Sequence, residues 1–130
     1  MTLLDLLERI REPYAANPTA TVRYATLAGG PENYSIEGVT PIAGARFGTD
    51  EVLIEMVDPP RTHPTTAGAL LAQLLELAKE HANDPVEICE PTIEIGNGMT
   101  VRIDHPLYTT GENVEDRSFY LFGLPMDPVG

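Results

Sequence analysis

The sequence predicts an α+β fold in which a mostly antiparallel sheet carries two helices on one face. Two segments place apolar residues at spacings of three and four, the period of an amphipathic helix. Several shorter segments are rich in β-branched and aromatic residues and are separated by glycine and proline, as strands and turns are. With 130 residues, the chain has the length of a single domain, 1–130.

The first helix is predicted at the N-terminus. Thr2 and Asp5 are spaced as in a capping box, in which each side chain accepts the other residue's backbone N–H. Pro13 predicts that the helix ends close to that residue. The expected apolar face consists of Leu3, Leu6, Leu7 and Ile10.

Three strands are expected next, at residues 21–28, 34–39 and 51–56. A glycine-containing turn at 29–33 joins the first two. Residues 58–64 contain three prolines, which favours a stiff connector over a helix or an interior strand.

The second helix is predicted to start from a cap at Thr65 or Thr66 and to run to about Asn83. Its apolar residues again recur at helical spacing: Leu70, Leu71, Leu74, Leu75 and Ala78.

The remaining strands are expected at residues 86–88, 92–95, 99–104 and 118–124. The last of them is almost entirely apolar, which is typical of a strand buried on both faces. Residues 105–117 are polar and predict a long loop that either presents Tyr108 and several acids to a partner or is disordered.

The turn before the strand at 99–104 is predicted from its register. A two-residue Asn-Gly turn would place Ile95 opposite Thr100 and so mix apolar with polar side chains. A three-residue loop places Ile95 opposite Met99 and keeps the apolar side chains together. We therefore expect the three-residue loop, with Gly98 at positive φ.

The two halves of the chain, 1–58 and 65–130, are similar on either side of the proline-rich connector. At a constant offset of 64, five residues recur: Thr2, Leu6, Leu7, Glu12 and Val22 match Thr66, Leu70, Leu71, Glu76 and Val86. One interpretation is a pair of pseudo-repeated α-β-β-β halves that share one core. The alternative is two independent segments with the same generic helix chemistry.

A short motif spans the second helix and the strand after it. It runs Thr66-Ala67-Gly68-Ala69-Leu70-Leu71 and then Asn83-Asp84-Pro85-Val86-Glu87-Ile88. This segment resembles small uncharacterised modules common in phages and actinobacteria, although Ala69 stands where those modules have an acidic residue. The resemblance covers residues 66–88, implies no activity or site, and favours a phage or mobile-element origin.

Charge restricts the class of partner. Twenty acidic residues oppose eight basic ones, giving a net charge of −12, which disfavours direct binding to nucleic acid or to an anionic membrane. It favours a basic protein surface, unless the charge serves only solubility. The acids concentrate in the second half, where we expect the partner-binding residues: Glu76, Glu80, Asp84, Glu87, Glu90, Glu94, Glu112, Glu115 and Asp116.

Catalytic and metal-binding motifs are not evident. His63, His81 and His105 lack the spacing of zinc ligands, so no metal or other cofactor is expected. Cys89 lies among acidic residues that disfavour a thiolate. Carboxylate pairs are available, as in any acidic protein, but no pattern marks them as catalytic.

The leading hypothesis is therefore a non-catalytic acidic protein that docks on a basic surface, such as a phage-type anti-defence inhibitor or nucleic-acid mimic. The alternative is a structural or assembly protein that self-associates, which leaves a homo-oligomer open. A third is a small-molecule-binding domain or enzyme that uses carboxylates. A single cysteine and the lack of an export signal lead us to expect a cytoplasmic protein.

Overall fold

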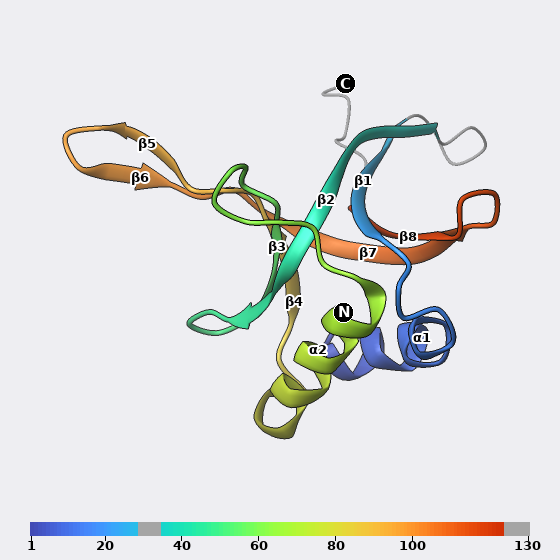
Figure 1. Ribbon diagram of the computed structural model, residues 1–130. Helices are drawn as coiled ribbons and strands as arrows, with labels where there is room; N and C mark the ends of the chain where they lie inside the picture. The colour runs from blue at the N-terminus through green and yellow to red at the C-terminus, as the bar shows by residue number, and fades with distance from the viewer. Residues whose placement is uncertain (29–34, 124–130) are drawn as a thin grey trace.

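Six strands form a closed barrel in the computed structural model, which describes residues 1–28 and 35–123 (Figure 1). Around the barrel the order is β1-β2-β3-β4-β7-β8. Their bounds are β1 Val22–Ala28, β2 Ser35–Phe47, β3 Val52–Met56, β4 Val86–Cys89, β7 Asp104–Asn113 and β8 Ser118–Gly123. Neighbouring strands are antiparallel except for β3 with β4 and β1 with β8, which are parallel.

The closed, mixed barrel corrects the expected sheet, although the α+β class is confirmed. We predicted a mostly antiparallel sheet with two helices on one face. Closure depends on parallel pairings between distant residues, in which Val52 lies opposite Val86 and Val22 opposite Phe119. The periodicity of a strand indicates which face is apolar but not which strand lies beside it, so closure left no local signal.

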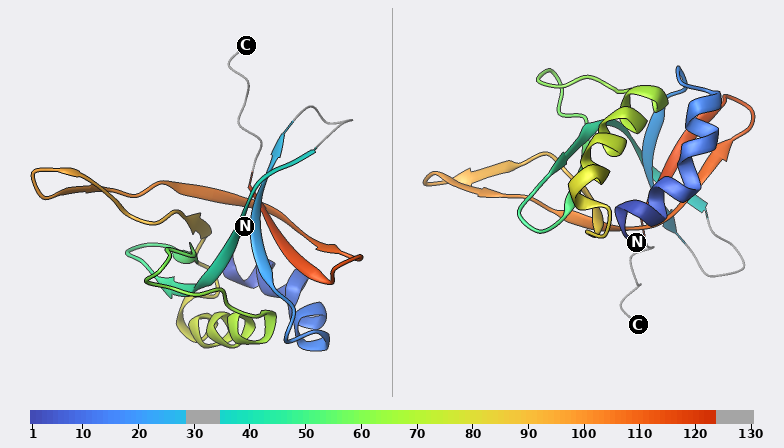
Figure 2. Two further views of the ribbon diagram at one scale, coloured as in Figure 1. Left: turned by 45° about the horizontal axis from the view of Figure 1, so that its top comes forward. Right: turned by 90° about the horizontal axis from the view of Figure 1, so that it is seen from below.

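The two helices lie side by side across one end of the barrel (Figure 2). α1 spans Leu3–Ala16 and α2 spans Ala67–His81. Both predicted caps are confirmed. The Thr2 hydroxyl accepts the Asp5 N–H at 3.2 Å, and the Asp5 carboxylate accepts the Thr2 N–H at 3.1 Å. The Thr66 hydroxyl accepts the N–H of Ala69 at 3.3 Å.

Two helix ends differ from the prediction. α1 continues for three residues past Pro13, because the buried Tyr14 anchors its last turn to the core. α2 ends at His81, two residues before the expected Asn83. Within the described ranges, neither helix combines the length and the apolar character that a membrane span requires.

One strand is much longer than expected. β2 extends well beyond the strand predicted at 34–39, since its first part pairs with β1 and its second part with β3. A register shift between Ile42 and Gly44 lets it bend around the barrel. Pro41 lies within this long strand and cannot donate a backbone hydrogen bond, but its carbonyl accepts the N–H of Val57 at 2.9 Å.

β7 occupies most of the segment 105–117, which we expected to be a loop. Its residues are mostly polar because only Leu107 among them is buried, so the apolar alternation that marks a strand is weak. β7 pairs with β4 at one end and with β8 along the rest of its length. A turn at 114–117 remains, with Arg117 at a φ of 57°.

β5 (Ile93–Gly96) and β6 (Met99–Val101) form a separate hairpin that projects from the barrel (Figure 1). Gly96 lies opposite Met99 and encloses a two-residue turn. The turn residues Asn97 and Gly98 have φ values of 53° and 74°, as a tight hairpin turn requires. The expected three-residue loop is therefore wrong, while the positive φ of Gly98 is confirmed.

A bulge reconciles the two-residue turn with the apolar pairing that we expected from a three-residue loop. The register shifts between Glu94 and Gly96, which adds a residue to β5. Beyond the shift, Ile93 lies opposite Val101, so apolar side chains still face each other across the ribbon. The turn that we expected at 29–33 lies outside the described residues.

The strand pairings of the two halves correspond. Thr2 bridges Pro85, and Thr21 bridges Thr66. Because Thr66 and Pro85 lie 64 positions after Thr2 and Thr21, each bridge joins the same two equivalent positions of the two halves. The parallel pairing of β1 with β8 likewise corresponds to that of β4 with β3. The set of pairings made by the first half thus recurs in the second.

The core lies between the inner faces of the strands and the facing sides of both helices. Tyr14 of α1 stacks on Phe119 of β8 with ring centroids 4.4 Å apart. Its hydroxyl is buried and has no hydrogen-bond partner in the part of the chain that is described. Burial accordingly raises the pKa of Tyr14, since the phenolate would be poorly solvated there.

We expect Tyr14→Phe to leave the free energy of unfolding unchanged or to raise it by up to about 1 kcal/mol, because it removes an unpaired buried hydroxyl. Tyr14→Ala should lower it by about 3–5 kcal/mol, because it removes the stacked ring and leaves a cavity. Urea denaturation of both variants measures the difference. A Tyr14→Phe variant that loses as much stability as Tyr14→Ala would contradict this role of the ring.

Candidate functional site

The projecting hairpin is an amphipathic ribbon, which we call the arm and define as residues 92–103. Alternation along its two strands separates apolar from polar side chains. One face carries Ile93, Ile95, Met99, Val101 and Ile103, which are between 41% and 59% exposed. The other face carries Thr92, Glu94, Thr100 and Arg102.

The apolar face of the arm is the most unusual surface of the described structure. These residues were predicted to be strands, and their alternation resembles that of a core-facing strand. The hairpin, however, belongs to a separate two-stranded sheet, so the core does not cover it. An isolated two-stranded hairpin is only marginally stable in water. A contiguous exposed apolar patch on a soluble domain is typical of a docking surface.

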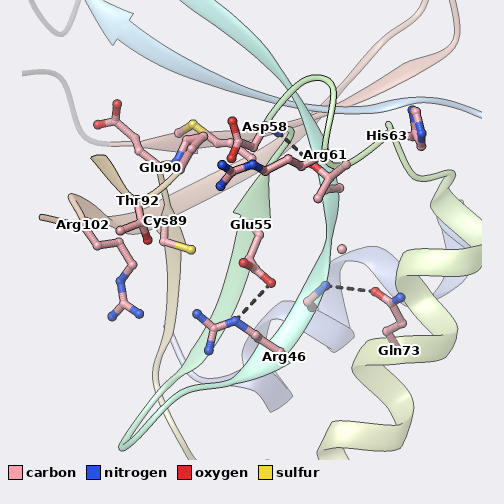
Figure 3. Close-up of a pocket in the computed structure, with 16 residues that line it drawn as sticks. Arg46, Glu55, Asp58, Arg61, His63, Gln73, Cys89, Glu90, Thr92 and Arg102 are labelled. Atoms are coloured by element: carbon pink, nitrogen blue, oxygen red, sulfur yellow. Dashed lines mark hydrogen bonds and ion pairs between the residues drawn. The ribbon is translucent and has the colours of Figure 1, made fainter. Parts of the chain in front are cut away.

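A groove of about 460 Å³ lies at the base of the arm (Figure 3). β2, β3, the connector after β3, α2 and the arm all contribute to its walls. We call it the arginine groove, because Arg46, Arg61 and Arg102 line it. Gln73 of α2 fixes one wall, since its side-chain oxygen accepts the backbone N–H of Ala45 at 2.9 Å.

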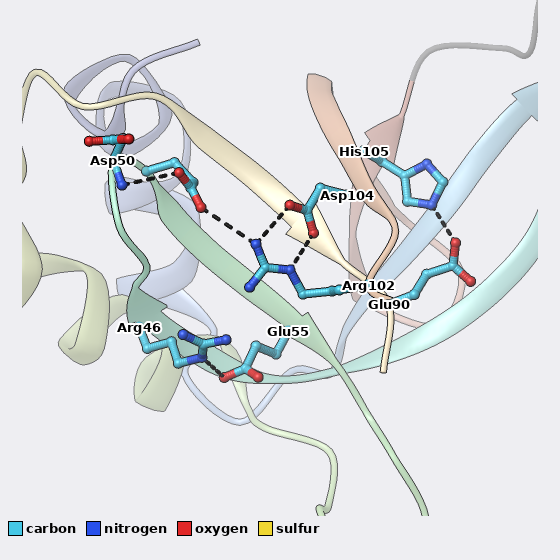
Figure 4. Close-up of polar contacts among 8 residues, drawn as sticks. Arg46, Asp50, Glu55, Glu90, Arg102, Asp104 and His105 are labelled. Atoms are coloured by element: carbon cyan, nitrogen blue, oxygen red, sulfur yellow. Dashed lines mark hydrogen bonds and ion pairs between the residues drawn. The ribbon is translucent and has the colours of Figure 1, made fainter. Parts of the chain in front are cut away.

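Ion pairs hold two of the three arginines (Figure 4). Arg46 of β2 contacts Glu55 of β3 through Nε at 3.1 Å. Arg102 binds Asp104 through two hydrogen bonds of 2.8 and 2.9 Å and lies 3.6 Å from Glu51. These pairs are partly exposed and each contributes little stability, but they orient the guanidinium groups.

Arg61 differs from the other two arginines. It lies on the connector, which is folded back by bonds from the Arg61 N–H to the Asp58 carbonyl and from the Asp58 N–H to the Thr62 hydroxyl. Among the described residues its guanidinium makes no ion pair. The groove is therefore lined by a cation that no described acid engages and that is available to an incoming carboxylate.

Cys89 forms part of the groove wall but is buried. Burial, reinforced by the negative charge of Glu55, raises the pKa of its thiol to about 11. The thiol is therefore neutral at physiological pH and unsuited to nucleophilic catalysis, in agreement with the argument from its acidic neighbours.

The predicted acids of α2 and the following loop are largely engaged in local contacts. Glu76 pairs with Lys79 at 2.8 Å, and Asp84 contacts the His81 ring at 2.9 Å. Glu80 lies 3.9 Å from the same ring. His81 also stacks on Phe47 with ring centroids 3.6 Å apart, so it fixes the C-terminal end of α2 against β2.

Three further predicted acids follow one another from β4 into the arm. Glu87 is half-buried on β4, and Glu94 lies on the polar face of the arm. Glu90 contacts the His105 ring at 2.7 Å (Figure 4). His105 in turn stacks on the buried Tyr24, with ring centroids 5.5 Å apart.

This Tyr24–His105–Glu90 cluster was missed in the sequence. Its members come from β1, from β7 and from the segment after β4, and no spacing relates them. Burial raises the pKa of Tyr24, which keeps its hydroxyl protonated.

The last three predicted acids, Glu112, Glu115 and Asp116, gather at the turn between β7 and β8. This turn lies at the opposite end of the molecule from the arm (Figures 1 and 2). The nine predicted acids are thus divided among α2 and its following loop, the arm with its base, and the distant turn. Across the described ranges, no three His, Cys, Asp or Glu side chains form a group that could hold a metal ion.

Comparison of the chain with protein-family models, with curated proteins and with solved structures gives no match. The chemistry of its own residues is therefore the basis for a functional proposal.

We expect Cys89 to react with a thiol reagent at pH 8 at least about 100-fold more slowly in the folded protein than in urea. A pKa raised from 9.0 to about 11 lowers the thiolate fraction by that factor, and burial slows access further. Absorbance of the released thiol dye measures the rate, and Cys89→Ser provides the blank. Equal rates in the folded and unfolded protein would show that the thiol is exposed.

Proposed function

We propose that this chain is a non-catalytic assembly protein that associates with further copies of itself through the apolar face of the arm. The observation that supports the proposal is the row of five exposed apolar side chains on a hairpin that lies outside the core.

The physical reason is the cost of leaving this face in water. Burying apolar surface contributes roughly 25 cal/mol per Å², so covering five large side chains is a substantial driving force. The barrel and helices do not supply that cover, because among residues 1–28 and 35–123 the hairpin pairs only with itself and it projects away from them (Figure 1). We therefore expect a partner to cover the apolar face of the arm.

A second copy of the arm is a suitable partner. Two ribbons with one apolar face each are self-complementary, as a two-fold interface requires. Their open strand edges also allow pairing between copies. The polar face carries one acid, Glu94, and one base, Arg102, so the arm is locally neutral in a chain of net charge −12. Two arms can therefore meet without the repulsion that opposes contact between the acidic surfaces.

Docking of a continuous acidic face on a basic partner receives less support from the structure. Charge predicted that interaction, but the carboxylates are spread over separate parts of the molecule, and several are engaged by Lys79, His81 and His105.

We expect a variant with Ile93→Thr, Ile95→Thr, Met99→Thr and Val101→Thr to lose the arm contact and to have a lower mass than the parent chain under conditions in which the parent chain associates. Threonine preserves strand propensity while removing the apolar face. Light scattering coupled to size exclusion, at several protein concentrations, measures the mass.

The matched control changes the opposite face of the same ribbon, with Glu94→Gln and Thr100→Ser, and should retain the parent mass. Circular dichroism verifies that both variants fold. The proposal fails if the threonine variant associates as strongly as the parent chain.

A further inference from the structure

We infer that a second contact joins copies of this chain, in which the acidic turn between β7 and β8 of one copy binds in the arginine groove of another. This inference extends the proposed function. A symmetric contact between arms stops at a pair, whereas a contact between two different surfaces continues from copy to copy as a ring or a filament.

The turn is held in one shape by its own side chains. The Asn113 side-chain oxygen accepts the N–H of Glu115 at 3.0 Å. The Asp116 carboxylate accepts both the N–H and the hydroxyl of the buried Ser118 and lies 3.5 Å from Arg23. A turn that is already ordered loses little conformational entropy on binding, which favours its use as a docking element.

The groups that this turn presents are an apolar tip flanked by free carboxylates. Val114 is 83% exposed, more than any other large apolar side chain in the described residues. Glu112 and Glu115 are exposed on either side of it and make no ion pair within the described ranges. The intramolecular bonds of the turn use Asn113 and Asp116 and leave these two carboxylates for a partner.

The arginine groove carries guanidinium groups and apolar side chains that match the carboxylates and the valine of the turn. Its volume of about 460 Å³ is sufficient for the side chains of a short turn. Arg61 has no ion-pair partner in the described part of the chain, and Arg46 uses only Nε toward Glu55. Both can therefore donate hydrogen bonds to incoming carboxylates. Ala43, Ala45 and Met56 supply apolar wall for the valine.

The charge distribution allows another copy of this chain to be the partner, in spite of the net negative charge of both copies. The groove is lined by three arginines and three acids, so its formal charge is balanced, whereas the whole chain has a net charge of −12. The groove is thus a region where an acidic segment of the same protein meets no net repulsion. The most exposed large apolar side chain among the described residues, Val114, lies at the centre of such a segment.

The geometry requires the contact to be intermolecular. The turn lies at the end of the molecule opposite to the arm (Figures 1 and 2). The groove is lined by Thr92 and Arg102 and so lies at the base of the arm. A chain cannot place this turn in its own groove. Thr92 and Arg102 of the polar face line the groove, so the apolar face of the arm points away from it and remains free for the arm contact. Both contacts can form at the same time.

A charge exchange tests the inference. Arg61→Glu and Glu115→Arg, made singly, should each weaken the contact at least 10-fold, so that sedimentation velocity shows arm-paired dimers where the parent chain forms larger species. The two changes made together in one chain restore opposite charges across the contact and should restore the larger species. The matched controls, Arg11→Glu and Glu12→Arg, alter the charge by the same amounts on the exposed side of α1 and should leave assembly unchanged.

The outcomes separate the two contacts. If the charge variants leave the mass distribution unchanged while the threonine variant of the arm is monomeric, the groove contact is refuted and the proposed function stands. If the charge variants dissociate the larger species while the arm variant does not affect mass, the arm contact is refuted and the groove contact stands. A parent chain that is monomeric at all concentrations refutes both.

Discussion

Two parallel strand pairings, β3 with β4 and β1 with β8, are the constraint on which the rest of the structure depends. Parallel neighbours cannot be joined by a tight turn, and the connection between β3 and β4 contains α2, which thereby reaches the end of the barrel. The pairing of β1 with β8 joins the two ends of the strand sequence and closes the sheet. Once the barrel is closed, its six strands have no free edge, and the open strand edges of the described chain are on the arm.

Local physical chemistry was sufficient to predict both helices and most of the strands but not their arrangement. Thr2 and Thr66 marked both helices because a cap and the apolar period are encoded within one segment. β7 was missed because it is half-exposed and polar, so its strand conformation comes from pairing with β4 and β8. Closure was missed for the same reason, since it depends on contacts between residues that no local pattern connects.

The candidate site likewise combines features that the sequence indicates locally with features that only the fold creates. The acids were identified by composition, but whether each is free or engaged depends on partners such as His105 and Lys79, which the fold brings close. The arginine groove joins side chains from strands, connector, helix and arm, and no sequence spacing indicates it. The apolar alternation of the arm was visible in the sequence. Only its position outside the barrel shows that this face, unlike that of β8, is not covered by the described residues.

The pairing of Val22 with Phe119 also has a consequence for how the protein is made. During synthesis the N-terminal strands leave the ribosome long before β8, so β1 and β3 await their parallel neighbours with unsatisfied backbone groups. Such long-range pairing makes folding slow and exposes the unfinished sheet to aggregation. The net charge of −12 acts against such aggregation whatever partner the folded protein has, because nascent chains of like charge repel one another until the last strand closes the barrel.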